Sequence, residues 1–325
     1  MMPERKAMTM AQTALFAWGQ TASPPRLVNM RENIVFEAHL KDGCHVALRL
    51  HRPGYQGRTG IETELRWCEA LSAQGLAVPR PVRAVNGRLT GGAGNRVASC
   101  VEWLDGVPIG AGDQPLGPDA AQVNAQAEAL GALIAQLHNA SDAAPPTNFT
   151  RHAWDADGLL GEQPQWGRFW EHPALTAAQA ALLQDARQFA QTQITAAQDF
   201  GPIHADILRE NVLATPLGLA LIDFDDCGPG YRLYDLATAL VQGWRDPLWG
   251  AQAAGLLSGY RAQRALSEDQ ANLLPLFVAL RGFASCGWIV SRAAGDDPRQ
   301  IAYIERACDF AQHMLDGTPP WQPKR

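Results

Sequence analysis

The chain has 325 residues, a formal net charge of −6 and an apolar fraction of 46%. That length suggests about two domains of ~150 residues, and the apolar fraction is sufficient for packed cores. The negative charge argues against nucleic-acid binding, which depends on Lys and Arg. We find no apolar run of roughly 18 residues that would span a membrane and no secretory signal.

The six cysteines form no C-x-x-C pair, which indicates free thiols in a reducing compartment. We therefore expect a cytoplasmic protein without nucleic-acid or membrane partners. The sequence leaves the oligomeric state open.

We expect residues 1–25 to be an N-terminal extension and residues 26–104 to be rich in strands. A strand over 33–40, an Asp42-Gly43 turn and an alternating strand over 44–51 predict a hairpin. Helical periodicity over 61–74 ends at Gly75. Further strands are predicted around Asn86-Gly87 and around Gly91-Gly92-Ala93-Gly94, which we interpret as a plain hairpin, and over 97–104.

A Gly/Pro-rich connector over 105–118 marks the expected domain boundary, and the pattern beyond it is mainly helical. Asp119 should cap a helix with one apolar stripe, formed by Val123, Ala127, Leu130, Ile134 and Leu137. Further helices are predicted over 176–197 and within 234–315. The predicted class is α+β with two lobes, a small β-rich N-lobe over 26–104 and a larger α-helical C-lobe over 105–325, with a cleft for a nucleotide.

The segment from His204 to Asp226 carries the most informative motif. His204 and Asp206 are followed by Asn211, and Asp223 comes twelve positions after Asn211, behind an apolar strand. Each residue alone is an ordinary turn former. Together they match the needs of phosphoryl transfer, namely a carboxylate for the acceptor hydroxyl and an amide and a carboxylate for Mg²⁺.

The 44–51 strand places Ala47, Arg49 and His51 on one face, where a nucleotide would lie. A protein kinase has a phosphate-binding Lys at the position of Arg49. A guanidinium can also pair with phosphate oxygens. The alternative is that Arg49 is an ordinary surface arginine.

In protein kinases, the phosphate-binding cation of this strand forms an ion pair with a glutamate on the following helix. Glu64 lies on the apolar face of that helix, which is formed by Ile61, Leu65 and Cys68. An acid there is costly unless it has a partner. We therefore choose Glu64 over Glu62 and Glu69 as the partner of Arg49.

The chain resembles the aminoglycoside phosphotransferase/choline kinase superfamily over about residues 26–290, and is similar above all to homoserine-kinase-like and stress-response-kinase-like bacterial members. The motifs that carry the resemblance are Ile203-His204-Ala205-Asp206 with Asn211, Leu221-Ile222-Asp223-Phe224-Asp225-Asp226, Tyr234-Asp235-Leu236-Ala237 and Leu133-Ile134-Ala135-Gln136-Leu137-His138. The resemblance implies a protein-kinase-like fold and transfer of the γ-phosphoryl group of ATP, or of GTP, to a small-molecule alcohol.

It further implies that Asp206 is the catalytic base, that Asn211 and Asp223 bind Mg²⁺ and that Asp235 braces the catalytic loop. His204 would hold this loop or transfer a proton. Asp225 would contact the metal or an ammonium group of the acceptor.

The resemblance also places the adenine against the backbone from Glu102 to Leu104. The first hairpin has no G-x-G-x-x-G, so the segment ending at Asn33 is all that could cover the phosphates.

The acceptor pocket is expected on the C-lobe, with candidates Trp154, Trp166, Trp170, Arg281, Trp288 and Arg292. Arg281, Trp288 and Arg292 share one helix face. Arg281 could hold a substrate carboxylate, as a hydroxy amino acid such as homoserine would require. A core stripe with snorkelling arginines explains the same spacing.

We therefore expect a kinase acting on an amino alcohol or hydroxy amino acid. A Ser/Thr protein kinase is one alternative, although only eight residues separate Asp226 from Asp235, too few for a peptide-docking loop. A non-catalytic nucleotide-binding protein would have lost the base or a metal ligand. A metal-dependent hydrolase would need several His ligands.

Overall fold

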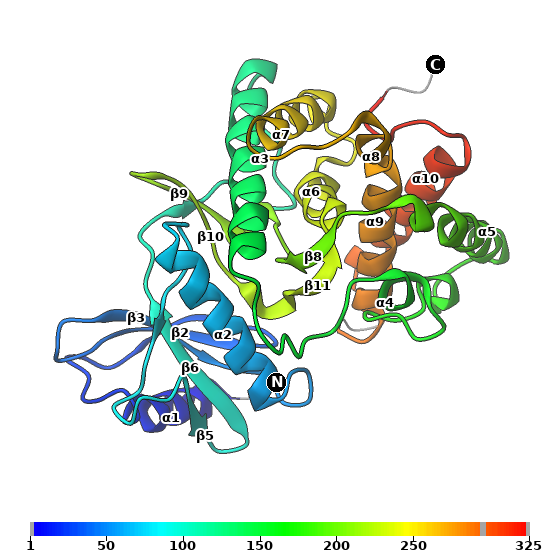
Figure 1. Ribbon diagram of the computed structural model, residues 1–325. Coiled ribbons are helices and arrows are strands. Elements are labelled where there is room, and N and C mark those ends of the chain that lie inside the picture. The colour runs from blue at the N-terminus through cyan, green and yellow to red at the C-terminus, as the bar shows by residue number, and fades with distance from the viewer. Residues whose placement is uncertain (1–2, 293–296, 323–325) are drawn as a thin grey trace. The chain divides into compact units, whose positions relative to one another are not determined.

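The structure, a computed structural model, describes residues 3–292 and 297–322. The chain divides into two compact units (Figure 1). Unit 1 comprises Met1–Val107, Ala144–Arg151 and Thr215–Asp225, and unit 2 comprises Pro108–Ala143, His152–Ala214 and Asp226–Arg325. The predicted α+β class is confirmed, because unit 1 is built on a sheet and unit 2 is mainly helical. The units differ from the expected lobes, since two later segments of the chain belong to unit 1.

Unit 1 contains a six-stranded sheet in the order β1-β2-β3-β6-β4, with β5 paired to β6, and all these pairings are antiparallel. Its strands are β1 (Arg26–Met30), β2 (Ile34–His39), β3 (His45–Leu50), β4 (Pro81–Val82), β5 (Thr90–Ala93) and β6 (Arg96–Glu102). Its helices are α1 (Glu4–Leu15) and α2 (Arg58–Ala73). The short strands β7 (Val107–Pro108) and β10 (Gly218–Leu221) follow later in the chain.

The predicted hairpins are present. Gly43 turns between β2 and β3 with φ +93°, a conformation that glycine adopts without strain. The register pairs His39 with His45. The glycine-rich strand β5 pairs with β6 as a plain hairpin, as interpreted from the sequence.

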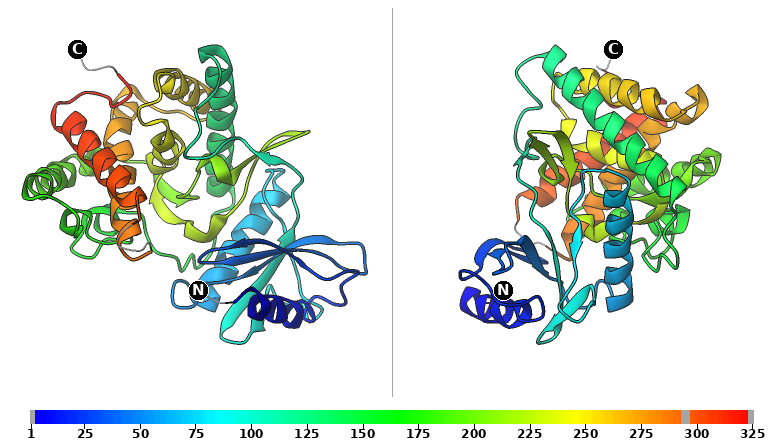
Figure 2. Two further views of the ribbon diagram at one scale, coloured as in Figure 1. Left: turned by 180° about the vertical axis from the view of Figure 1, so that it is seen from behind. Right: turned by 60° about the vertical axis from the view of Figure 1, so that its left-hand side comes forward.

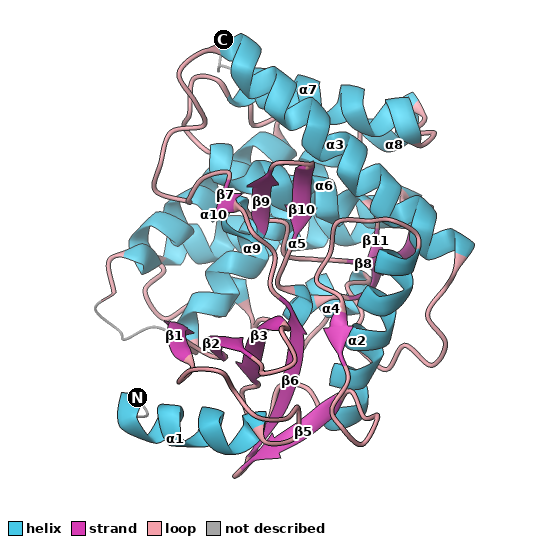
Figure 3. Cartoon of the chain, turned by 90° about the vertical axis from the view of Figure 1, so that its left-hand side faces the viewer, coloured by secondary structure: helices cyan, strands magenta, loops and turns pink. Residues whose placement is uncertain are grey.

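Helix α1, within the segment 1–25 that was expected to be an N-terminal extension, covers one face of the sheet. Its buried side chains join a core cluster formed by Ala7, Ala11, Ala14, Leu15, Trp18, Phe36, Val46, Leu48, Leu50 and Cys100, among others. Figure 3 shows α1 beside β5, and Trp18 approaches Gly91 so closely that a Cβ there would lie 3.0 Å from the indole ring. The N-terminal segment is therefore an integral part of unit 1.

Helix α2 packs beside the opposite face. Its residues Ile61 and Leu65 form a second cluster with Leu89, against which Val97 and Val101 pack. The sheet of unit 1 is thus covered by one helix on each side, and Ala47 and Arg49 lie on the α2 side with Val101.

Unit 2 is built from eight helices within the described residues, and Figure 2 shows them from two further directions. They are α3 (Ala120–Ala143), α4 (Ala156–Leu160), α5 (Ala177–Gln193), α6 (Leu233–Leu240), α7 (Trp249–Gln263), α8 (Glu268–Ala271), α9 (Leu274–Val290) and α10 (Arg299–Leu315). Strands β8 (Phe200–Ile203) and β11 (Gly228–Tyr231) form an antiparallel pair, and β9 spans Val212–Thr215.

Helix α3 begins as predicted, with the Oδ1 of Asp119 accepting a hydrogen bond from the backbone N–H of Gln122 at 2.9 Å. It packs tightly on α7 through glycines. A Cβ on Gly259 would lie 1.8 Å from the carbonyl oxygen of Glu128, so these two backbones can approach only without that side chain.

The segment Glu268–Val290 has the length and apolar composition of a membrane-crossing helix, but 72% of its apolar window is buried inside the protein. Its second part, α9, is a core helix of unit 2. Helix α9 also contains the buried Arg281, which forms an ion pair with Asp206.

Candidate active site

The loop after β8 is held in a strained conformation by one buried carboxylate. Ala205 has φ +65°, in the left-handed region, which costs a non-glycine residue about 1 kcal/mol. Asp235 at the start of α6 accepts hydrogen bonds from the backbone N–H groups of Ala205 (2.7 Å) and His204 (2.9 Å). Asp235, expected to brace this loop, is thus bonded to the backbone just before Asp206.

Both carboxylate oxygens of Asp206 have donors. Oδ2 accepts a hydrogen bond from the Nδ2 of Asn211 at 2.9 Å, and Oδ1 accepts one from the Nη2 of Arg281 at 3.0 Å. Asn211 also donates to the carbonyl oxygen of Asp206 at 2.9 Å. Its own Oδ1 accepts no hydrogen bond from the described residues, and is the group that a hard metal ion would use.

His204 is completely buried. Its Nδ1 accepts a hydrogen bond from the backbone N–H of Asp206 at 3.3 Å. Of the two roles left open for His204, this geometry favours holding the loop, because a buried ring that accepts from the backbone is positioned to orient Asp206.

A second buried histidine supports Asp235 from α3. The Nε2 of His138 lies 3.1 Å from the Oδ2 of Asp235, and its Nδ1 lies 2.9 Å from the hydroxyl of Tyr260. Burial lowers the pKa of His138, against the raising effect of Asp235. Burial alone would raise the pKa of Asp235, but the hydrogen bonds from the His138 side chain and from the backbone of His204 lower it. The pair is therefore a carboxylate and a neutral imidazole.

This pair predicts an acid-sensitive stability. The unfolded chain protonates His138 near pH 6.5, whereas the folded chain does so only at lower pH. Because the unfolded state binds the extra proton, the free energy of unfolding should fall as the pH drops below about 6.5, by up to about 1.4 kcal/mol per pH unit. Asp235, with its lowered pKa, contributes only below about pH 4.

Urea unfolding between pH 7.5 and 5 measures this effect. His138→Gln keeps a donor toward Asp235 but cannot titrate, so its stability should vary less with pH than that of the wild type. His152→Gln, at an exposed position, is the control. Equal slopes for wild type and His138→Gln would contradict the assignment.

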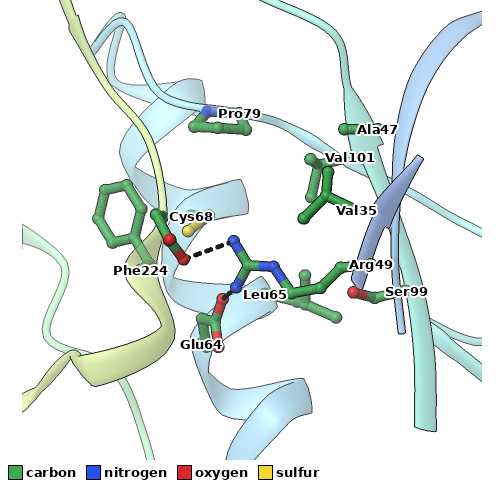
Figure 4. A pocket seen from close by; sticks show the side chains of 11 residues that line it. Val35, Ala47, Arg49, Glu64, Leu65, Cys68, Pro79, Ser99, Val101 and Phe224 are labelled. Atoms are coloured by element: carbon green, nitrogen blue, oxygen red, sulfur yellow. Dashed lines mark hydrogen bonds and ion pairs between the residues drawn. The ribbon is translucent and has the colours of Figure 1, made fainter. Parts of the chain in front are cut away.

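In unit 1, Arg49 lies among three carboxylates, and Figure 4 shows it beside Glu64. Its Nη1 is 3.2 Å from the Oε1 of Glu64, its Nη2 is 2.9 Å from the Oδ1 of Asp223, and the Oδ1 of Asp225 is 3.9 Å from Nη1. The predicted pairing of Arg49 with Glu64 is therefore present. Burial would lower the pKa of Arg49, but the charges of Asp223, Glu64 and Asp225 outweigh it and raise this pKa.

Sequence reasoning missed Arg151, which completes this cluster. Its fully buried guanidinium pairs with Glu64 at 3.3 Å and donates to the carbonyl oxygens of Phe224 and Asp225. Burial would raise the pKa of Asp225, but the facing His51 and the charges of Arg49 and Arg151 lower it. No motif distinguishes Arg151 in its loop, so no sequence signal pointed to it.

Three carboxylates and two guanidinium groups leave this cluster with one surplus negative charge. Asp223 is the most exposed of the three acids, at 46% of its side chain, and it has φ +64°. Asp and Asn tolerate that left-handed conformation better than most residues. A surplus negative charge with an exposed carboxylate fits the binding of a divalent cation.

A small pocket of about 50 Å³ adjoins the Arg49 cluster. Its lining residues are Val35, Ala47, Arg49, Glu64, Leu65, Cys68, Pro79, Ser99, Val101, Asp223 and Phe224. Three predicted nucleotide-binding residues, Ala47, Arg49 and Glu64, therefore line one pocket.

The other three predicted nucleotide-binding residues, Asn33, Glu102 and Leu104, are not among the residues that line this pocket. The Oδ1 of Asn33 accepts a hydrogen bond from the backbone of Arg52 at 2.9 Å, and Glu102 pairs with Arg80. Leu104 follows β6.

The acceptor candidates fall into two groups. Trp154 is buried, stacks on Tyr234 and donates to the carbonyl oxygen of Asp226 at 2.8 Å, so it is structural. Trp170 is buried under the guanidinium of Arg187, 3.9 Å from the ring centroid. Neither is among the residues that line the pocket beside Arg49 or the pocket beside Trp166.

Trp166 is placed differently. The guanidinium carbon of Arg281 lies 4.9 Å from its ring centroid. Trp166 and Arg292 also line a pocket of about 480 Å³, whose lining comprises residues 164–168, Glu171, Gly287 and residues 290–292. The guanidinium carbon of Arg292 lies 5.1 Å from the ring centroid of Trp288. Arg292 follows the end of α9. Arg281 itself bonds to Asp206, which sequence periodicity did not anticipate.

The comparisons with known proteins show that this protein is a kinase, an enzyme that transfers a phosphoryl group. The chain belongs to the phosphotransferase enzyme family, whose model matches residues 27–271. It is 30% identical to a microcompartment-associated aminopropanol kinase of known structure, with a TM-score of 0.82 and coverage of 95% of this chain and 97% of that chain.

Two further proteins illustrate the relationship. A homoserine kinase from Chelativorans sp. (strain BNC1) is 27% identical over 268 residues, which cover 79% of this chain and 76% of that protein. An amicoumacin kinase solved with AMP-PNP, Ca²⁺ and Ami shares the fold, with 20% identity, a TM-score of 0.77 and coverage of 98% and 97%.

Proposed function

We propose that this enzyme transfers the γ-phosphoryl group of ATP, with GTP as an alternative donor, to a hydroxyl group of a small molecule. An amino alcohol or a hydroxy amino acid is the expected class, with a homoserine-like compound favoured. The observation that carries this proposal is the Asp206 carboxylate, held by Asn211 and Arg281 on a strained loop. Two of the relatives named above, an aminopropanol kinase and a homoserine kinase, are named for compounds of these classes.

Asp206 orients the acceptor hydroxyl and takes its proton. The acceptor oxygen forms a bond to the γ-phosphorus, the bond from that phosphorus to the bridging oxygen breaks, and ADP leaves. Because the transition state is loose, proton transfer comes late. An ordinary ionised carboxylate is sufficient for this role.

Asn211 and Asp223 are the proposed metal ligands, since amide and carboxylate oxygens suit Mg²⁺. The metal would supply neutralisation of charge on the phosphate oxygens. Arg49 is the proposed phosphate contact, positioned by Glu64. In the structure Arg49 is paired with Asp223 at 2.9 Å, so binding of a metal by Asp223 would release Arg49 for the phosphates.

The structure of the segment after Asp226 argues against a protein as the phosphoryl acceptor. The residues that an activation loop would occupy form β11 (Gly228–Tyr231), which pairs with β8. Cys227 and Arg232 at either side are buried. A segment fixed in this way offers no extended surface for a peptide. A cytoplasmic location would fit a small-molecule kinase that uses a nucleotide.

A coupled ADP-release assay tests the proposal. The acceptors should include amino alcohols, hydroxy amino acids, choline-like compounds, thioribose-like sugars and aminoglycosides. We expect acceptor-dependent ADP release that requires Mg²⁺. The absence of acceptor-dependent ADP release across the panel with both ATP and GTP would oppose the proposal.

Asp223→Asn tests the metal site within the same assay. Asparagine tolerates the left-handed backbone but lacks the charge, so half-maximal activity should require at least about tenfold more Mg²⁺. Asp113→Asn, at an exposed position, is the control. An unchanged Mg²⁺ dependence would remove Asp223 from the metal site.

A further inference from the structure

Arg306 on α10 is a buried cation that has no counter-ion among the residues that the structure describes. It is only 9% exposed, and it makes no hydrogen bond or ion pair with any residue within 3–292 or 297–322. Its guanidinium carbon lies 4.7 Å from the ring centroid of Tyr303. Burying an unpaired charge is costly, so a ligand that supplies the missing negative charge would explain this residue.

The position of Arg306 relates it to the catalytic residues of unit 2. Helix α10 packs closely on α9, where a Cβ on Gly282 would lie 2.5 Å from the ring of Phe310. Arg306 is four residues, about one turn, before Phe310. Burial lowers the pKa of Arg306 to about 10, against the raising effect of Tyr303, and the charge of Arg281 lowers it further. Arg306 therefore remains a cation at neutral pH and lies within electrostatic range of Arg281.

Arg281 is already engaged. Its Nη1 donates to the Oγ of Ser285 at 2.5 Å, and its Nη2 donates to the Oδ1 of Asp206 at 3.0 Å. Asp206 neutralises Arg281, so the two guanidinium groups and one carboxylate leave a surplus of one positive charge. That surplus is located on Arg306, and it matches a monoanion.

We propose that Arg306, within electrostatic range of Arg281, binds the carboxylate of a hydroxy-acid phosphoryl acceptor. This inference rests on the proposed function. A planar guanidinium fork suits a carboxylate, and the acceptor hydroxyl would then be presented to Asp206. Arg281 acts as a positioning residue for Asp206, a role that replaces its expected contact with the substrate.

A free inorganic anion would satisfy the same chemistry, and the acceptors of the assay must therefore form a matched pair. L-Homoserine and 3-amino-1-propanol carry the same hydroxyl and amino groups on the same chain length, and only L-homoserine has the carboxylate. Sulfate serves as the inorganic anion.

The kinetic test compares Arg306→Met, Arg306→Lys and the control Arg261→Met, whose parent side chain pairs with Glu268 away from these residues. For Arg306→Met, KM for L-homoserine should rise by about 10- to 100-fold, the scale of one charge-assisted contact. KM for 3-amino-1-propanol should stay within about twofold. Arg306→Lys should recover part of the L-homoserine KM. Equal changes for both acceptors, or wild-type preference for 3-amino-1-propanol, would overturn the inference while leaving the kinase assignment intact.

Thermal unfolding without nucleotide provides an independent readout. L-Homoserine should raise the Tm of the wild type and of Arg261→Met, but not that of Arg306→Met. Sulfate at the same concentration should give a smaller Tm shift, and an equal shift would indicate an inorganic-anion site instead.

Without ligand, Arg306→Met should be at least as stable as the wild type, because the substitution removes an unpaired buried charge. A lower Tm would identify Arg306 as structural. If L-homoserine shifts the Tm through Arg306 and no ADP is released, the kinase proposal fails and the carboxylate site remains.

Discussion

Asp206→Asn is expected to lower kcat by at least about 100-fold, the scale of a lost general base. The single oxygen of asparagine can still accept the hydrogen bond from Arg281 or the one from Asn211, but the side chain cannot take the acceptor proton. Nucleotide affinity should change little, because the proposed phosphate contact is Arg49. The measurements are steady-state ADP release and calorimetric titration with the nonhydrolysable nucleotide AMP-PNP and Mg²⁺.

Asp185→Asn is the matched control, since Asp185 is exposed on α5. Its kcat should equal that of the wild type. Retention of more than about one tenth of kcat by Asp206→Asn would show that proton acceptance by Asp206 is dispensable. A joint loss of kcat and nucleotide affinity would instead indicate damage to the fold.

Asp235→Asn should be the most destabilising of the substitutions considered. The carboxylate is completely buried and accepts hydrogen bonds from the backbone of His204 and Ala205 and from His138. An amide nitrogen would be directed at one of these donors. We expect a loss of about 3–5 kcal/mol in the free energy of unfolding, measured by urea unfolding at pH 7.5.

Activity should also fall in the fraction of Asp235→Asn that remains folded, because the left-handed turn at Ala205 would relax and displace Asp206. Asp269→Asn on α8, which is exposed, is the control and should match the wild type within about 0.5 kcal/mol. Wild-type stability for Asp235→Asn would show that the loop keeps its conformation without this brace.

Local periodicity was sufficient to predict the Arg49 ion pair. Alternation along β3 placed Arg49 on the face opposite Val46 and Leu48, and the cost of an acid on an apolar helix face singled out Glu64. Both arguments use spacing within one element, and the antiparallel sheet with α2 beside it then brought the two side chains to 3.2 Å.

Contacts between distant segments could not be predicted in the same way. Arg151 and Arg281 both lie in stretches where nothing in the sequence specifies a partner, yet they bind Glu64 and Asp206. Helix α1 buries mainly alanines, and an alanine stripe is a weak apolar signal. The inclusion of 144–151 and 215–225 in unit 1 likewise depends on tertiary packing alone.

The left-handed backbone at Asp223 also limits how this lineage can change. Branched or bulky residues would strain the turn, so inherited variants at this codon are restricted mainly to asparagine and glycine. A single base change converts an aspartate codon to asparagine. A descendant that had weakened its metal site while keeping its shape would therefore be expected to carry asparagine at this position.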